Sequence, residues 1–248
     1  MSRQIQTAVI LAAGLGSRLG TLKNDKPKAF LRVGNETLIN RSIRLLIKQG
    51  INKIIIGTGY GSTHFDALTK TFPQASTHRN DKFESTGSMY TLYLLRNLIN
   101  DPFLLLEGDL LYGAEALHHL MGDEHEDIIL ASTPTHSGDE VFIQCNEHQE
   151  LVNMSKNKAE LDLVSGELVG ISKLTNKSLE QMATYAADCY RNDEMHIHYE
   201  DALVGIAGSR SLSVKVVPDL AWCEIDDAAH LDRAISVVYP KIAEQEGL

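Results

Sequence analysis

A glycine-rich segment near the N-terminus has the composition of a phosphate-binding loop. Residues 11–19 read LAAGLGSRL and overlap an apolar stretch, residues 7–12, that has the length of a buried strand. Glycine allows a close approach of the backbone to a ligand, and N–H groups in a loop that opens onto a helix can cradle phosphates. The candidate phosphate-binding positions are Leu11, Ala12, Ala13, Gly14, Gly16 and Ser17.

Two common phosphate-binding motifs do not fit this segment. A dinucleotide fingerprint needs glycine where Leu19 stands, and a P-loop needs Gly-Lys-Ser/Thr where the chain has Leu19-Gly20-Thr21. With Pro27-Lys28, the segment instead resembles the signature of the sugar-phosphate and alcohol-phosphate nucleotidyltransferases. The resemblance implies a Rossmann-like catalytic domain in which Arg18 and Lys28 hold and polarise triphosphate oxygens. The alternative is a structural Gly-rich turn beside solvated lysines.

A second glycine turn, Thr86-Gly87-Ser88, precedes a helix that we expect over residues 88–99. In the families that the sequence resembles, a turn at this point reads the base through backbone groups. We therefore predict that Thr86, Gly87 and Ser88 bind the nucleotide. Ser88 also suits the N-cap of the helix, and the two roles are compatible.

Acidic residues follow two further expected strands. Asp109 comes after residues 103–107 (FLLLE), and Asp226 and Asp227 come after residues 221–225. Magnesium is usually held by one or two carboxylates together with phosphate oxygens and water. In the enzymes that the sequence resembles, one aspartate from each place brackets the ion, which implies that Asp109 and Asp226 bind Mg²⁺. Asp227 competes for the second position, although a helix that starts there favours an N-cap role.

The second half of the chain contains motifs that point to the other substrate. They are Ser137-Gly138-Asp139-Glu140-Val141, Met154-Ser155-Lys156, residues 167–173 (ELVGISK) and Tyr199-Glu200-Asp201-Ala202-Leu203. Together with the turn at 86–89 and residues 222–227, these motifs resemble the 2-aminoethylphosphonate cytidylyltransferases, which are related to bacterial phosphocholine cytidylyltransferases. The resemblance covers almost the whole chain. It implies CTP and 2-aminoethylphosphonate as substrates, with pyrophosphate released.

The residue types in these motifs suit a small zwitterionic acceptor. Lys156 could bind the phosphonate, while Glu140, Glu200 and Asp201 could bind the ammonium group, whose N–H donors favour carboxylates. A quaternary choline head has no such donors and favours an aromatic cage. Val141 stands where the phosphocholine enzymes have an aromatic residue, which favours a primary amine. A partial cage could still come from Tyr90, Tyr93, Tyr199 and Trp222.

These residues lead to a mechanistic hypothesis. Lys28, Arg18 and Lys156 stabilise charge during an in-line displacement at the α-phosphorus, where catalysis is mostly positioning and electrostatic stabilisation. A general base is not needed, because a phosphonate is already ionised at neutral pH.

The elements that position these residues alternate through the first half of the chain. We expect strands over residues 7–12, 53–57, 103–107 and 127–132, and helices over 37–49, 62–72, 88–99 and 114–121. Such alternation predicts parallel strands with right-handed crossovers. Ligands bind such sheets beyond the carboxyl ends of the strands, where the Gly-rich segment and Asp109 lie.

The second half has a different pattern. Strands are expected over residues 140–145, 167–173, 213–217 and 221–225, with helices over 178–190 and 227–243. We therefore predict an α/β protein, with a Rossmann-like doubly wound mixed sheet and a β-rich acceptor lid. Residues 1–248 would form one domain, with 1–135 mainly binding the nucleotide and 136–248 mainly binding the acceptor.

Composition limits the choice of partners. The net charge is −10, yet the first 35 residues contain six basic residues and one acid, Asp25, which favours a small anionic ligand and argues against nucleic acid. No apolar run approaches the roughly 20 residues of a membrane helix, and three widely spaced cysteines suit a reducing compartment. We expect a cytoplasmic protein that does not contact membranes and that could form a homodimer.

Other functions remain as alternatives. Within the same enzyme class, the acceptor could be phosphocholine, phosphoethanolamine or a sugar 1-phosphate, although acidic motifs suit a cation better than a ring of hydroxyls. A nucleotide-sensing subunit without turnover could use the same fold. Such a subunit would be expected to lack the metal-binding aspartate or the phosphate-binding lysine. Here Asp109, Asp226 and Lys28 are all present.

Overall fold

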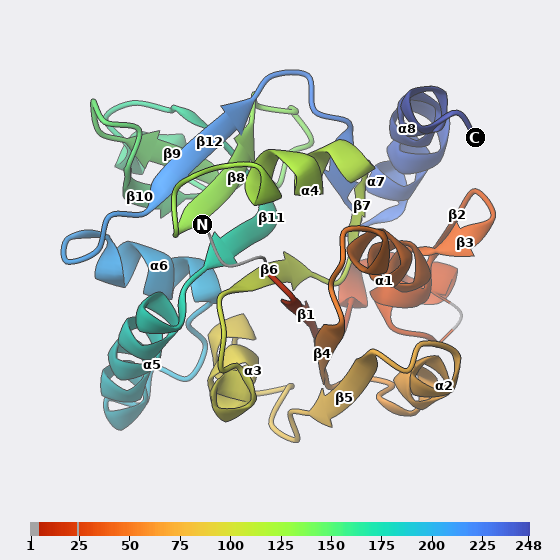
Figure 1. Ribbon diagram of the computed structural model, residues 1–248, viewed down its shortest axis with the longest axis horizontal. Coiled ribbons are helices and arrows are strands. Elements are labelled where there is room, and N and C mark those ends of the chain that lie inside the picture. Colours follow the sequence, from red (N-terminus) through yellow and green to blue (C-terminus); the bar gives the residue numbers. More distant parts are fainter. Residues whose placement is uncertain (1–4, 24) are drawn as a thin grey trace.

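The computed structural model describes residues 5–23 and 25–248, and a nine-stranded sheet runs through its centre (Figure 1). The strands follow the order β10-β9-β11-β6-β1-β4-β5, and β8 pairs with both β11 and β12. Their bounds are β1 Thr7–Ala12, β4 Lys53–Thr58, β5 Ala75–Arg79, β6 Phe103–Glu107, β8 Ile128–Ser132, β9 Phe142–Cys145, β10 Leu151–Ser155, β11 Gly166–Leu174 and β12 Ser213–Val217.

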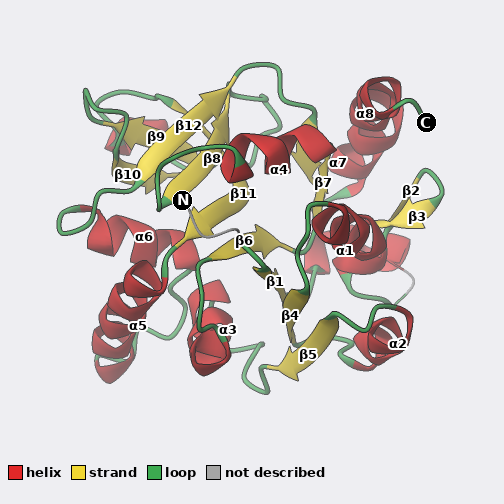
Figure 2. Cartoon of the chain, in the orientation of Figure 1, coloured by secondary structure: helices red, strands yellow, loops and turns green. Residues whose placement is uncertain are grey.

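Helices cover both faces of this sheet, and two small two-stranded sheets are separate from it (Figure 2). The helices are α1 Leu38–Lys48, α2 Thr63–Thr71, α3 Ser88–Leu95, α4 Ala114–Met121, α5 Asn176–Arg191, α6 Tyr199–Ala207, α7 Ala228–Arg233 and α8 Tyr239–Glu246. One small sheet pairs β7 Leu110–Tyr112 with β13 Trp222–Glu224, and the other pairs β2 Arg32–Val33 with β3 Glu36–Thr37.

The parallel part of the sheet is buried on both faces. Strand β1 pairs in parallel with β4 and β6, so Thr7 lies opposite both Lys53 and Phe103. Because successive side chains of a strand point to opposite faces, Ile10 packs with α1, α2 and α4, whereas Val9 packs with α3, α5 and α6. This arrangement confirms the predicted doubly wound α/β fold.

Strand β11 joins the two halves of the chain into one sheet. It is antiparallel to β6, β8 and β9, which makes the sheet mixed, as predicted. Its pairing with β8 shifts register between Leu168 and Ser172, where Gly170 has a φ of 80°. That left-handed conformation favours glycine, and a Cβ there would lie 2.7 Å from Glu107 Oε2. The irregularity therefore makes room for an acidic side chain at the end of β6.

Several predicted boundaries were wrong, for identifiable reasons. The helix expected over 227–243 is α7, a π-helical turn at Ala234–Val238, and α8. The helix expected over 88–99 ends at Leu95 and continues as a 3₁₀ turn, Arg96–Leu98. Strand β5 (ASTHR) was missed because it is polar and lies at the edge of the sheet, where apolar residues are not required.

Helix α6 was also missed, and this omission bears on function. Its first turn contains Glu200 and Asp201, which the sequence suggested as acceptor ligands. Among the helices of residues 5–23 and 25–248, none is both long and apolar enough to cross a membrane.

Candidate active site

A cavity of about 340 Å³ lies between the two halves of the chain. It collects side chains from the ends of β1, β6 and β13 and from the loops that precede α3 and β9. Residues that the sequence predicted and that line it are Leu11, Ala13, Gly14, Arg18, Thr86, Gly87, Ser88, Asp109, Glu140, Lys156 and Glu200. The fold thus brings predicted donor and acceptor residues to one cavity.

A smaller pocket adjoins this cavity at the Gly-rich loop. Ala12, Gly16 and Lys28 line it, and it shares Gly14 and Asp109 with the main cavity. Gly16 has a φ of 60°, and a Cβ there would lie 2.6 Å from the Lys28 side chain. Glycine therefore permits both the turn of the loop and the passage of Lys28 behind it. Ser17, by contrast, is among the lining residues of neither pocket.

Lys28 connects the two aspartates that were predicted to bind magnesium. Its ammonium group lies 3.0 Å from Asp109 Oδ2 and also contacts Asp226 Oδ1. Burial lowers the pKa of Lys28, but attraction to Asp109 and Asp226 outweighs this effect and raises that pKa above its ordinary value. Lys28 is therefore positively charged, and it offsets part of the negative charge of Asp109 and Asp226.

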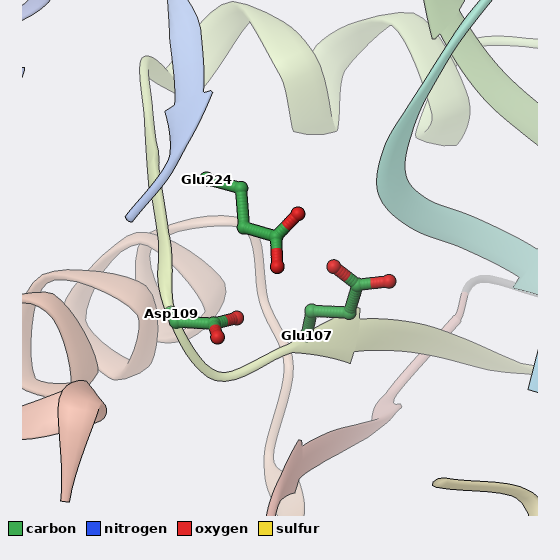
Figure 3. Close-up of side chains that lie close together, drawn as sticks. All are labelled: Glu107, Asp109 and Glu224. Atoms are coloured by element: carbon green, nitrogen blue, oxygen red, sulfur yellow. The ribbon is translucent and has the colours of Figure 1, made fainter. Parts of the chain in front are cut away.

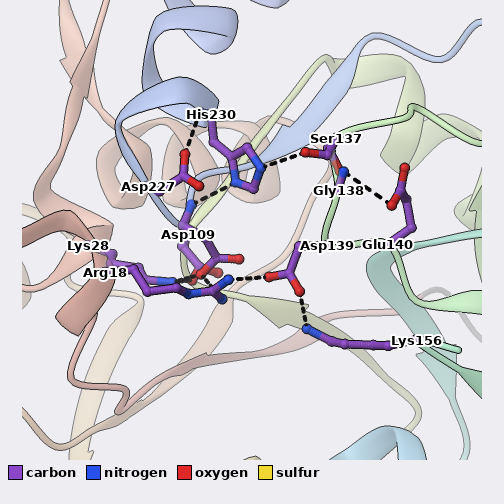
Figure 4. A network of polar contacts seen from close by, with 11 residues as sticks. Arg18, Lys28, Asp109, Ser137, Gly138, Asp139, Glu140, Lys156, Asp227 and His230 are labelled. Atoms are coloured by element: carbon purple, nitrogen blue, oxygen red, sulfur yellow. Dashed lines mark hydrogen bonds and ion pairs between the residues drawn. The ribbon is translucent and has the colours of Figure 1, made fainter.

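Arg18 and Lys156 share a carboxylate that belongs to Asp139 (Figure 4). Arg18 Nη1 lies 2.6 Å from Asp139 Oδ2, and Lys156 Nζ lies 2.6 Å from Asp139 Oδ1. A second guanidinium nitrogen of Arg18 lies 3.0 Å from Asp226 Oδ1. Burial raises the pKa of Asp139, but the hydrogen bonds from Lys156 and Arg18 prevail and lower it to about 2. Sequence reasoning quoted Asp139 only as part of a motif.

Three acidic side chains converge on the floor of the cavity, namely Glu107, Asp109 and Glu224 (Figure 3). One carboxylate oxygen from each lies within 4.8 Å of the others. The sequence analysis did not propose Glu107 or Glu224 for this role. Each is the last residue of a strand and precedes a predicted metal ligand, Asp109 or Asp226, by two residues. That spacing is the signal that could have identified both.

The carboxyl groups of the acidic floor repel one another when ionised, and a bound cation would offset that repulsion. Burial, followed by repulsion from Glu200 and Asp109, raises the pKa of Glu107 to about 8. Burial, followed by repulsion from Asp109 and Glu107, raises the pKa of Glu224 to about 11. The buried Oδ2 of Asp226 has no hydrogen-bond partner. Carboxylate oxygens are the ligands that Mg²⁺ prefers, so these residues have the right chemistry to hold it.

The turn at residues 86–88 is fixed by contacts to the second half of the chain. Gly87 N donates to Met195 O at 3.0 Å, and Ser88 Oγ accepts from Tyr199 N at 3.0 Å. The N-cap of α3 is Gly87, so the N-cap role expected of Ser88 was wrong, since its hydroxyl accepts from helix α6 instead. Asn80, which the sequence did not suggest, stabilises the turn by donating a hydrogen bond to Thr86 Oγ1.

The predicted acceptor residues lie in different environments. Glu200 is half-buried and lines the cavity, burial raises its pKa to about 7, and its buried Oε2 has no hydrogen-bond partner. Glu140 Oε2 accepts from Gly138 N of its own loop at 3.2 Å. Asp201 accepts from His198 N at 2.7 Å and completes the capping box of α6. Its position therefore does not support the acceptor role that we expected.

Asp227 has the structural role that the sequence favoured. Its Oδ1 accepts from His230 N at 2.9 Å, which makes it the N-cap of α7. Neither Asp227 nor the predicted metal ligand Asp226 belongs to the acidic floor formed by Glu107, Asp109 and Glu224; Asp226 instead contacts Lys28 and Arg18.

The sequence matches the MobA-like NTP transferase domain over residues 8–189. The match covers most of the chain, and the fold and the position of the Gly-rich loop agree with it. The chain therefore belongs to the MobA-like NTP transferase family.

Two relatives and one solved structure extend this comparison. A choline-phosphate cytidylyltransferase of Streptococcus pneumoniae is 37% identical over 98 residues, which span 40% of this chain and 42% of that protein. A 2-aminoethylphosphonate cytidylyltransferase of Lancefieldella rimae is 22% identical over 237 residues, which span 90% of this chain and 89% of that protein. The structure of a CTP:phosphocholine cytidylyltransferase from Streptococcus pneumoniae has a TM-score of 0.80 at 23% identity, covering 94% of this chain and 99% of that chain, and so shares its fold.

The raised pKa values predict that cation binding at the acidic floor strengthens as the pH rises. A carboxyl group with a pKa of about 8, as in Glu107, is mostly protonated at pH 6 and ionised at pH 9. Mn²⁺ affinity, measured from the electron paramagnetic resonance signal of the free ion, should therefore increase over this range. Glu224→Gln should weaken binding by about tenfold or more. The exposed control Glu115→Gln should match the wild type, and equal affinities for both variants would contradict the assignment.

Gly87→Ala should weaken CTP binding without unfolding the protein. The backbone φ of Gly87 is −78°, which alanine adopts easily, but a Cβ would lie 2.1 Å from Ile197 O. The turn must therefore move, and we expect a loss of roughly tenfold or more in CTP affinity by isothermal titration calorimetry, since turn position governs base contacts. Gly208→Ala is the matched control, because a Cβ there meets no atom within 4 Å. Unchanged CTP affinity in Gly87→Ala would show that the turn does not contact the nucleotide.

Proposed function

We propose that the protein transfers the cytidylyl group of CTP to a small zwitterionic acceptor, 2-aminoethylphosphonate, and releases pyrophosphate. The observation that supports this proposal is that three features lie in one cavity. These are the Gly-rich loop, the cations Arg18 and Lys156, and a floor of half-buried carboxylates. The similarity to cytidylyltransferases, including one for choline phosphate and one for 2-aminoethylphosphonate, supports the cytidylyl donor and a small phosphate or phosphonate acceptor.

The acceptor ammonium is assigned to the carboxylates around Glu200. The Oε2 of Glu200 is buried without a partner, and Glu107 and Glu224 line the same cavity. An ammonium group with N–H donors can bind several carboxylates at once, and its charge offsets their mutual repulsion. The phosphonate at the other end of the molecule is assigned to Lys156, whose Nζ reaches the cavity from the end of β10.

Two of the four aromatic residues expected to form a partial cage do not line the cavity. Tyr90 and Tyr93 pack edge-on against Tyr190, with ring centroids 5.3 and 5.6 Å apart, and neither is among the residues that line the cavity. Tyr199 and Trp222 do line it, together with Phe83. The choice of a primary amine over choline therefore rests on the unpartnered carboxylate oxygen of Glu200, since a quaternary ammonium has no N–H to donate to it.

The remaining residues of the cavity are assigned to binding Mg²⁺ and the triphosphate during the displacement at the α-phosphorus. Mg²⁺ would be held by Asp109 and Asp226, with Glu107 and Glu224 nearby, and it would neutralise charge on the phosphate oxygens. Backbone N–H groups of the Gly-rich loop and the side chain of Arg18 bind the triphosphate, while Lys28 stabilises the charge that develops at the α-phosphate. Lys156 orients the acceptor oxygen, which is already ionised and needs no base.

Pyrophosphate release from CTP with a panel of acceptors tests this proposal. The panel consists of 2-aminoethylphosphonate, phosphoethanolamine, phosphocholine and glucose 1-phosphate, assayed in the presence of Mg²⁺. We expect the highest kcat/KM with 2-aminoethylphosphonate. A clear preference for phosphocholine would overturn the acceptor assignment and keep the cytidylyl donor. Tight CTP binding with no turnover of any acceptor would favour a nucleotide-sensing role.

Glu200→Gln should separate acceptor binding from nucleotide binding. The amide has nearly the shape of the carboxyl group but lacks its charge, so one charge-assisted hydrogen bond to the ammonium is weakened. We expect the KM for 2-aminoethylphosphonate to rise about 10- to 100-fold, with the KM for CTP nearly unchanged. Glu180→Gln, at an exposed position of α5, is the control. An equal rise in both KM values would show that Glu200 supports the whole site and does not bind the ammonium.

A further inference from the structure

We infer that Asp139 is a positioning residue that couples the triphosphate-binding cation Arg18 to the acceptor-binding cation Lys156. The inference rests on the proposed function, because it takes the roles of Arg18 and Lys156 from it. It goes further in assigning a role to a carboxylate between the two substrates that neither substrate nor metal is expected to bind.

Asp139 belongs to a chain of alternating charges that begins at Lys156, and it is the second member of that chain (Figure 4). Its two oxygens contact different cations, Arg18 and Lys156, at 2.6 Å each. Beyond Arg18 the chain continues through Asp226 to Lys28 and ends at Asp109. The acceptor half and the nucleotide half of the cavity are therefore joined by ion pairs, and Asp139 is the member of the chain that joins Lys156 to it.

The loop that carries Asp139 is anchored on both sides of the cavity. His230 Nε2 donates to Ser137 O at 3.2 Å, while His230 Nδ1 accepts from Asp226 N at 3.3 Å. Thr135 donates from its backbone N–H and its hydroxyl to the buried Glu167. The imidazole thus holds the loop against the segment that contains Asp226. As a result, the Asp139 carboxylate, which is only 18% exposed, has a fixed position.

Arg18 and Lys156 need such a fixed partner. Their side chains are 54% and 61% exposed, and each has many rotamers in solution. Exposed ion pairs contribute little to stability, so the effect of Asp139 lies in orientation. In-line transfer requires the acceptor oxygen close to the α-phosphorus, and a misplacement of about 1 Å can reduce the rate about 100-fold. One carboxylate shared by both cations sets the distance between the groups that hold the two substrates.

Asp139 is absent from the acidic floor. Among the described residues, the cluster suited to a metal ion consists of Glu107, Asp109 and Glu224. Asp139 instead has a cation at each oxygen, which favours a role in orienting those cations.

Steady-state kinetics of Asp139→Asn tests the inference, with whichever acceptor the wild type uses best. We expect kcat to fall about 10- to 100-fold while the KM values for CTP and acceptor change less than about threefold, because the substrates still bind but are misaligned. Asp139→Glu should recover part of kcat, and thermal unfolding of each variant checks folding. Asp188→Asn, at an exposed ion pair on α5, is the control.

Two results would overturn the inference. If Asp139→Asn lowered both KM values at unchanged kcat, the carboxylate would compete with the substrates for Arg18 and Lys156. If it behaved like Asp188→Asn, the ion pairs would have no role in turnover.

A double-mutant cycle on binding of Mg²⁺–CTP keeps the test independent of the acceptor. In Lys156→Met, Arg18 is the remaining cation of Asp139, so the carboxylate pairs with Arg18 more strongly and draws it away from the triphosphate. This variant should therefore weaken CTP binding at least about threefold, and the same change in an Asp139→Asn background should have little effect. Equal effects in both backgrounds would show that Lys156 acts on CTP without Asp139. If no acceptor is turned over, the proposed acceptor fails, while this cycle still decides the coupling.

Discussion

The balance between half-buried carboxylates and a few cations controls the arrangement of this site. Glu107, Asp109 and Glu224 converge at the ends of two strands, where burial and mutual repulsion oppose their ionisation. Lys28 offsets part of this charge by contacting Asp109 and Asp226. A floor with this excess of acid attracts cations, and both a divalent metal and an ammonium group meet that requirement.

The mixed sheet explains how such a floor can be assembled. Parallel strands β1 and β6 end at the same edge, which places the Gly-rich loop beside Glu107 and Asp109. Antiparallel strand β11 adds the second half of the chain to that sheet, and its left-handed Gly170 leaves space for Glu107. The two-stranded sheet of β7 and β13 then brings Glu224 opposite Leu110, next to the same floor. Donor and acceptor residues therefore rest on one continuous backbone framework.

The two halves also contact each other above the floor. Gly87 and Ser88 are bound to residues 195–199, and Arg18 reaches Asp139. Each contact links a group expected to bind nucleotide with one near the acceptor. In a displacement reaction, such contacts would help to hold two anionic reactants close together against their mutual repulsion.

The sequence alone determined the features that depend on local pattern. Apolar runs located β1, β4, β6 and β8, helical periodicity located α1 and α5, and glycines with Arg18 and Lys28 indicated a phosphate site. Only the tertiary structure showed that Glu107 and Glu224 share the floor and that Asp139 lies between Arg18 and Lys156. The reason is physical: these contacts join residues up to 121 positions apart, as with Arg18 and Asp139, and depend on strand register and loop anchoring, which local residue patterns do not encode.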